Sequence, residues 1–147
     1  MAICEDKDLE QENISHVFGH ASRLMHNYVL NKLRPYGMGL EQLGILHYLA
    51  CADNAISIGE LSAFLLKDMT TTSRLISSLE SKGLVTKTKD SKDKRITHIR
   101  ITKKGKDKIE ELSFFAQDVD ALFDDTLDSA ELAALRNILI KIIKVVQ

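Results

Sequence analysis

Two helical patterns directly before a pair of β-branched segments constrain the fold of this chain more than any other feature. Ser57 and Glu60 have the spacing of a capping box, in which each side chain accepts a hydrogen bond from a backbone N–H at a helix start. A second amphipathic helix is predicted at about residues 70–82, and Gly83 ends it as a C-terminal cap. The residues expected to be buried are Leu61, Phe64, Leu65, Thr72, Leu75, Ile76 and Leu79.

The β-branched segments cover residues 84–89 and 96–102 and are separated by six polar residues, so they predict a β-hairpin. A helix–turn–helix followed at once by a basic-tipped hairpin is the winged-helix arrangement. Its second helix fits a DNA major groove roughly 12 Å wide, with the hairpin tip near the adjacent minor groove. We expect Arg95 to enter that minor groove, where the negative potential is strongest. A charged turn that contacts nothing is the alternative.

Positive charge is concentrated in the same third of the chain. Over residues 67–108, thirteen basic residues stand against five acidic ones, although the net charge of the whole chain is −1. Seven basic and sixteen acidic residues remain elsewhere. This distribution is typical of a protein that binds a polyanion. A solvated basic face without a partner is the alternative.

The outward face of the second helix carries short hydrogen-bonding side chains around one arginine. Its members are Thr70, Thr71, Ser73, Arg74, Ser77 and Ser78. Serine and threonine lower helix stability, so a helix that faces only water would carry Glu and Lys instead. The composition therefore indicates close approach to another polar surface. The base sequence cannot be inferred from it, because hydroxyl groups hydrogen-bond to several base edges.

The chain has 147 residues, 44% of them hydrophobic, which suffices for one core and one domain. A long amphipathic helix is predicted from Ile14 to just before Pro35, and a shorter one over residues 39–49. A last helix has an apolar stripe over residues 132–146. Together with the first helix and the aromatic stretch at 114–123, it has more apolar surface than one core needs. We therefore expect a dimer interface built from the two ends of the chain.

Several local motifs occur together in one order. They are Asp68 and Arg74 around the Thr/Ser-rich helix start, Leu79-Glu80-Ser81-Lys82-Gly83-Leu84-Val85, Asp93-Lys94-Arg95, and Ile101-Thr102-Lys103-Lys104-Gly105. With them, residues 61–105 resemble the MarR family of bacterial transcriptional regulators. The family's order of helices and wing extends over almost the whole chain, from about residue 14 to residue 146.

The resemblance implies a mainly α fold with a small β-hairpin wing, in a single domain spanning residues 1–147. It assigns residues 37–105 to the winged helix–turn–helix and residues 1–36 and 106–147 to helical dimerisation regions. It also implies DNA contacts from Thr70, Thr71, Ser73, Arg74 and Ser77 in the major groove, from Arg95 at the wing tip, and from Lys92 and Lys94 on phosphates, with Asp93 holding the turn. Thr72 stands where the family has an apolar residue, and we expect it to be buried and bonded to the backbone.

The resemblance further implies a homodimer that binds a pseudo-palindromic operator in double-stranded DNA, with half-sites roughly 34 Å apart. Repression is the implied outcome, with release by a small-molecule effector bound between the dimerisation and DNA-binding parts. The sequence does not identify that effector, the operator or the regulated genes. A winged-helix module that offers its basic hairpin to an acidic protein partner is the alternative function.

Cysteine and histidine side chains are the candidates for sensing an oxidant or a metal ion. Cys4 and Cys51 are too few for a disulfide framework. The oxidant-sensing branch of the family has its cysteine inside the first helix, near where this chain has His16 or Val17, so a cysteine switch is not expected. The pairs His16/His20 and His47/Cys51 have i, i+4 spacing, which puts two metal ligands on one helix face. Such pairs arise readily by chance, and ordinary histidines are the favoured interpretation.

The remaining features exclude other classes of protein. The N-terminus lacks an export signal, and no apolar run reaches the roughly 18 residues of a membrane span, so a soluble cytoplasmic protein without a membrane partner is expected. No glycine-rich phosphate loop, nucleophile motif or paired carboxylates are recognisable. We therefore expect neither an enzyme nor a cofactor.

Overall fold

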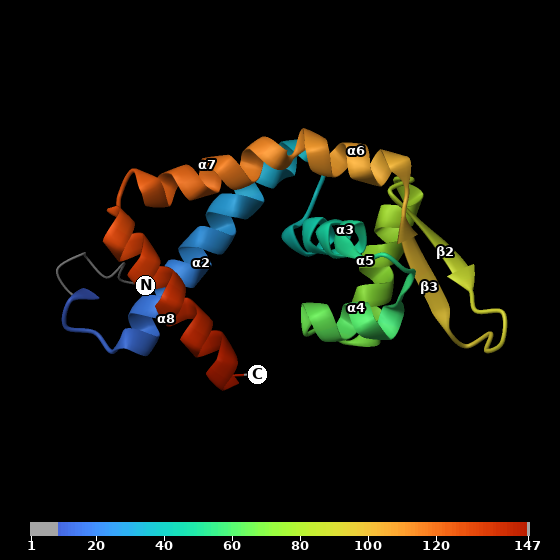
Figure 1. Cartoon of the computed structure of the whole chain (residues 1–147), viewed down its shortest axis with the longest axis horizontal. Helices are drawn as coiled ribbons and strands as arrows, with labels where there is room; N and C mark the ends of the chain where they lie inside the picture. Colours follow the sequence, from blue (N-terminus) through green and yellow to red (C-terminus); the bar gives the residue numbers. More distant parts are fainter. Residues whose placement is uncertain (1–8, 147) are drawn as a thin grey trace, which may run out of the picture.

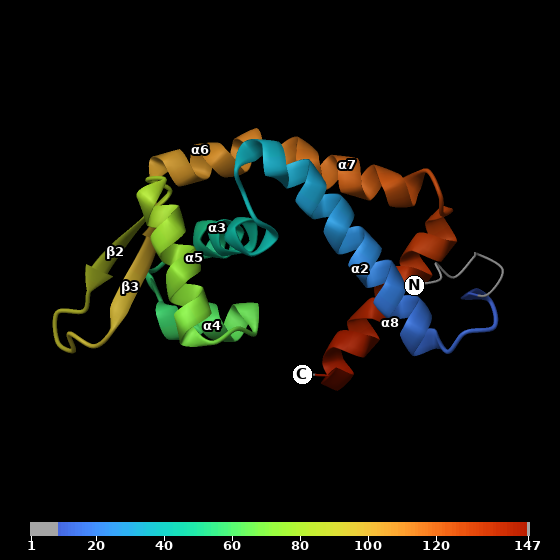
Figure 2. The ribbon, with the colours of Figure 1, turned by 180° about the vertical axis from the view of Figure 1, so that it is seen from behind.

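The computed structural model describes residues 9–146, which form two lobes joined by an arch of helices (Figure 1). The elements in chain order are α2 (Ile14–Leu33), the 3-10 helix η1 (Arg34–Tyr36), α3 (Leu40–Cys51), β1 (Ile56–Ser57), α4 (Ile58–Leu65), α5 (Met69–Ser81), β2 (Val85–Lys89), β3 (Thr97–Ile101), α6 (Lys103–Glu111), α7 (Ser113–Asp124) and α8 (Ser129–Val146). One lobe contains α3, α4, α5 and the sheet, whereas the other contains α2 and α8 (Figure 2). Helices α6 and α7 run across the top and connect them.

The strands form one antiparallel sheet in the order β1-β3-β2. Pairs from Val85 with Ile101 to Lys89 with Thr97 make the wing hairpin, so the predicted mainly α fold with a β-hairpin wing is confirmed. Strand β1 was not predicted. It has only two residues, which is too short to produce an alternating pattern, and it exists because Ile56 pairs with Ile99.

The core lies between α3, α4, α5 and the inner face of the sheet. Its fully buried side chains are Leu33, Ile45, Leu46, Leu61, Thr72, Ile76, Leu79, Val85 and Ile99. Phe64, expected to be buried, is 46% exposed, because it lies on the flank of the two-turn helix α4 and packs on Tyr48 with ring centroids 4.4 Å apart. Leu65 and Leu75 are only half-buried. The expected core was therefore correct along the central line of each helix, whereas Leu65 and Leu75 at its edges pack against it while remaining partly exposed.

Thr72 occupies the centre of the face that α5 turns towards the core. Its side chain is fully buried, and its hydroxyl donates to the Asp68 carbonyl at 3.0 Å. Bonding to the preceding turn satisfies a polar group in an apolar interior, where an unpaired hydroxyl would be costly. The expectation for this residue is confirmed.

Two glycines fix how α5, the wing and α6 meet. Gly83 has φ +73 and ends α5, with the Leu84 N–H donating to the Leu79 carbonyl at 3.0 Å. Gly105 lies in the first turn of α6, where an added Cβ would stand 2.2 Å from the Leu84 carbonyl oxygen. Thr102 caps α6 by accepting from the Gly105 N–H at 3.0 Å. The close approach requires glycine and packs the arch against the wing.

The lobe of α2 and α8, called the lobe of the chain ends from here on, has little core of its own. Helix α8 has no buried residue, and Ile138, Ile143 and Val146 are 53%, 50% and 76% exposed. In α2 only Leu33, beside the other lobe, is buried. None of the helices within residues 9–146 combines the length and apolarity that crossing a bilayer requires.

Candidate nucleic-acid interface

Helix α5 begins at a well-formed cap. The Asp68 carboxylate accepts from the Thr71 N–H at 2.8 Å and from the Thr71 hydroxyl at 2.7 Å. These hydrogen bonds lower the pKa of the Asp68 carboxyl. Thr71, expected to contact DNA, therefore donates its hydroxyl proton within the chain and retains only acceptor capacity for a base.

The other expected contact residues of α5 divide by exposure. Thr70, Arg74 and Ser77 are exposed, and their spacing puts them on one face of the helix, whereas Ser73 is half-buried. A salt bridge from Arg74 is absent within residues 9–146. Its guanidinium therefore keeps its donors for an external acceptor.

Lys87 of β2 was missed by sequence reasoning. Its ammonium donates to the Ser77 hydroxyl at 2.8 Å and pairs with Glu80 at 2.9 Å. The wing is thereby attached to the outer face of α5. No sequence signal could have revealed this contact, because it joins residues that only the folded hairpin brings together.

The wing turn is organised by Asp90, a second residue that was missed. Its Oδ1 accepts from the N–H groups of Asp93 and Lys92, both at 2.8 Å, and its Oδ2 lies 3.0 Å from Nε2 of His98. These bonds, the one from Asp93 first, lower the pKa of the Asp90 carboxyl from its ordinary 3.8 to about 2. An aspartate at the start of a polar turn is the signal that could have identified it.

Asp93, which was expected to hold the turn, lies within the wing turn. Its carboxylate accepts from the Arg95 N–H at 3.0 Å and lies 3.5 Å from the Arg95 Nε. The Arg95 side chain is nevertheless 93% exposed, and Lys92 and Lys94 are also exposed. The wing tip therefore presents three cations to solvent on a backbone that the Asp90 and Asp93 carboxylates hydrogen-bond. Figure 1 shows the tip projecting beyond the sheet, away from the lobe of the chain ends.

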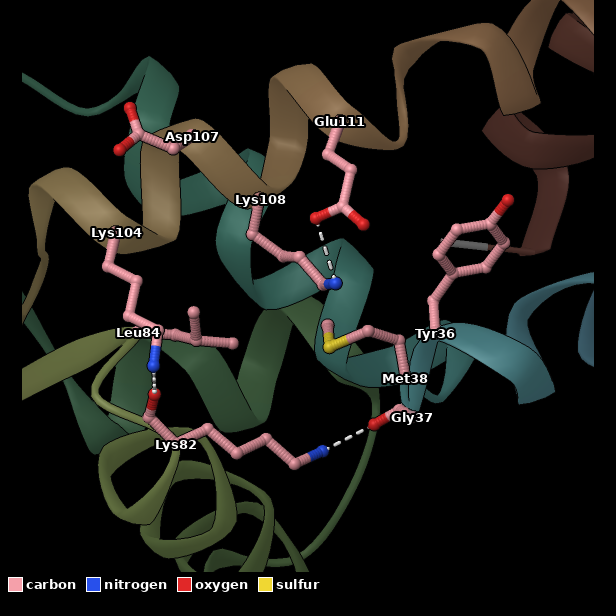
Figure 3. Close-up of a pocket in the computed structure, with 9 residues that line it drawn as sticks. All are labelled: Tyr36, Gly37, Met38, Lys82, Leu84, Lys104, Asp107, Lys108 and Glu111. Atoms are coloured by element: carbon pink, nitrogen blue, oxygen red, sulfur yellow. Dashed lines mark hydrogen bonds and ion pairs between the residues drawn. The ribbon is translucent and has the colours of Figure 1, made fainter.

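A cavity of about 360 Å³ lies where the two lobes meet. Its walls come from η1, the end of α5 and α6, and its lining includes Tyr36, Lys82, Lys104, Lys108 and Glu111 (Figure 3). Lys108 pairs with Glu111 at 2.9 Å and also lies 5.7 Å from the centre of the Tyr36 ring. The cavity thus offers one aromatic wall and several ammonium groups.

The candidate sensing residues are separate from this cavity. His16 lies 2.8 Å from Glu12, and both are exposed. His47 and Cys51 are exposed on α3, whereas Cys4 lies outside the described residues. Residues 9–146 contain no group of three or more His, Cys, Asp or Glu side chains placed to hold a metal ion.

Comparisons with known proteins agree with this arrangement. A sequence profile of the MarR family matches residues 36–96. The chain is 37% identical to the HTH-type transcriptional regulator SarZ of Staphylococcus saprophyticus over 78 residues, which is 53% of each chain, so it matches about half the length of that curated relative.

Solved structures share the whole fold. MepR of Staphylococcus aureus, in a complex with DNA, superposes with a TM-score of 0.81 at 23% identity, over 90% of this chain and 98% of that one. The apo form of MarR from E. coli gives a TM-score of 0.75 at 23% identity, over 89% and 97% of the two chains. At these identities the likeness concerns the fold. The profile, the sequence relative and the fold thus agree that this chain is similar to the MarR family of winged-helix regulators.

Proposed function

We propose that this protein is a transcriptional regulator that binds an operator in double-stranded DNA. The observation that carries the proposal is the exposed Thr70, Arg74 and Ser77 face of α5 together with an exposed, cationic wing tip. Hydroxyl and guanidinium donors suit base edges in the major groove, and an arginine at a hairpin tip suits the minor groove. The contact set comprises Thr70, Thr71, Ser73, Arg74, Ser77, Lys92, Lys94 and Arg95, with Asp93 shaping the turn.

The acting species is a homodimer held together by residues 1–36 and 106–147, and residues 37–105 form the DNA-binding region. The unburied apolar side chains of α8 support this division, because they need a partner surface. A two-fold dimer reads a pseudo-palindrome whose half-sites are about one helical turn apart. Bound there, the protein represses transcription by blocking the promoter.

A small-molecule effector releases the protein from DNA, and the cavity between the lobes is its binding site. Its position supports this assignment, because Tyr36 and Lys82 in its wall belong to η1 and to the end of α5. A ligand that fits one relative orientation of these segments would shift the population towards that orientation.

Binding to the DNA directly upstream of the protein's own gene tests the function. It should be compared with random DNA of equal length over a salt series. We expect a palindromic site bound at least about a thousand-fold more tightly than random DNA, with a salt slope that reports several phosphate contacts. Equal weak binding to both, with no motif recovered in a genome-wide selection, would favour the protein-interaction module instead.

A further inference from the structure

A polar network joins the end of α5 to Gln42 of α3 and to Gly37, the cap of the 3-10 helix η1 that directly continues α2. The Lys82 ammonium donates to the Gly37 carbonyl at 2.5 Å and to Oε1 of Gln42 at 3.3 Å. Nε2 of Gln42 in turn donates to the Ser78 hydroxyl at 2.9 Å. Figure 3 shows Lys82 extended along the cavity wall towards Gly37, which ends η1.

Both ends of this network are held in place. Gln42 is only 8% exposed, and its Oε1 also accepts from the Gly39 N–H at 3.2 Å. The backbone carbonyl of Lys82 accepts from Lys104 of α6 at 2.8 Å. A buried amide with both ends bonded has one favourable orientation, because any rotation leaves a polar group unpaired. The network therefore specifies an orientation more than it adds stability.

The acceptor that Lys82 uses is informative. Asp107 and Glu111 line the same cavity, yet Lys82 forms no ion pair within residues 9–146 and donates to a carbonyl at the end of η1. A carbonyl in a turn fixes direction, whereas an exposed carboxylate would allow many geometries. The ammonium is thus directed at the junction between the lobes.

We propose that Lys82 and Gln42 are positioning residues that fix the angle of α5 relative to α2 and thereby set the half-site spacing that the dimer accepts. The spacing consequence rests on the proposed function. In a two-fold dimer, a change of angle at each junction moves both reading helices, and one base pair corresponds to only about 3.4 Å along the DNA. If the angle at the junction varied, the dimer would therefore bind operators of different half-site spacing with similar affinity.

The first test measures the angle directly, without DNA. Spin labels at Arg23→Cys and Lys67→Cys, with Cys4 and Cys51 replaced by serine, report the distance between α2 and the α4–α5 turn. Labelled chains are diluted into unlabelled protein so that each dimer carries one pair. We expect one narrow distance distribution for the native junction, a broad one for Lys82→Met and a narrow one again for Lys82→Arg. An unchanged width in Lys82→Met would overturn the proposal.

The second test uses operators whose half-sites are moved apart or together by one or two base pairs. Native protein should prefer one spacing by at least about 10-fold, whereas Lys82→Met should prefer none by more than about 3-fold, with an unchanged salt slope. Lys103→Met, which removes an exposed lysine of α6, is the matched control and should keep the preference.

The outcomes of these tests separate the positioning role of Lys82 from the proposed function. A uniform loss of affinity at all spacings, with a salt slope reduced by about one, would mean that Lys82 contacts phosphate, and the positioning role would be wrong. Broadened distances in Lys82→Met together with no sequence-specific binding by native protein would refute the proposed function and leave the positioning role standing.

Discussion

The two lobes of this molecule differ in how completely they bury their own apolar side chains. The lobe of α3, α4, α5 and the wing closes a core whose central residues, such as Ile45 and Leu79, are fully buried. The lobe of the chain ends leaves Ile138 and Ile143 about half exposed. The first lobe turns polar and cationic groups outward, whereas the second turns apolar groups outward. This difference fits the proposal that the first surface binds a polyanion and the second binds another copy of the chain.

The largest expected effect tests the lobe of the chain ends. Ile138→Glu with Ile142→Glu should raise the dimer dissociation constant by at least about 100-fold, because each unpaired carboxylate that the interface buries costs several kcal/mol. Sedimentation velocity over a concentration series measures this. Lys141→Glu, between the two positions, is the charge-matched control and should remain dimeric. A dimer that survives the double substitution would place the interface elsewhere.

The next effect tests the polar face of the other lobe. Arg74→Ala with Arg95→Ala should lower operator affinity by at least about 100-fold, because each specific arginine contact with a base is worth about 1–3 kcal/mol. The dimer should remain intact, and Arg23→Ala on α2 should change the affinity little. Fluorescence anisotropy with labelled operator and with random DNA measures the affinity of each variant. An equal loss of affinity in the double variant and in Arg23→Ala would mean that overall charge, rather than specific contacts, causes the effect.

A smaller effect concerns how well the wing turn is held in one conformation. Asp90→Ala should remove amide exchange protection at Lys92 and Asp93 and weaken operator binding about 10-fold, because the turn loses its hydrogen-bond acceptor. Asp107→Ala on α6 is the matched control. Protection that persists at both amides would show that the turn does not depend on this carboxylate.

The pKa of Asp90 gives the same test a pH dependence. The carboxyl has a pKa lowered from 3.8 to about 2, so its ionised form favours the folded turn. That contribution is complete above pH 3.8 and is lost as the pH falls through about 2. The Lys92 amide resonance of the native protein, whose N–H donates to Asp90, should shift in this window, and that of Asp90→Ala should shift much less.

The smallest effect is a gain in stability at a residue in the lobe of α3, α4, α5 and the wing. Leu66, the C-cap of α4, has φ +53 and is 90% exposed. A side chain in this left-handed conformation costs roughly 1–2 kcal/mol, so Leu66→Gly should raise the free energy of unfolding by about 0.5–1 kcal/mol. Urea denaturation measures the change. Lys67→Gly, whose φ is not positive, should give no such gain.

Patterns among residues close together in the sequence predicted much of the local structure. The capping box of Ser57 and Glu60, the end of α5 at Gly83 and the wing hairpin all follow from residues within a few positions of one another, and each is present. The buried, back-bonded Thr72 was predictable for the same reason, because its acceptor is one helical turn away. Local geometry alone determines these features.

Contacts between distant segments required the tertiary structure. The pairing of β1 with β3, the bonds from Lys87 to α5 and the network from Lys82 to Gly37 join residues that no periodicity relates. Phe64 was misjudged because helical spacing gives its face but not which neighbour covers that face.

The sequence by itself therefore determined the fold class, the main helices and the wing hairpin, because caps, turns and stripes depend on local geometry. Only the tertiary structure decided how the wing attaches to α5 and how the two lobes are oriented, because those contacts depend on how whole elements pack.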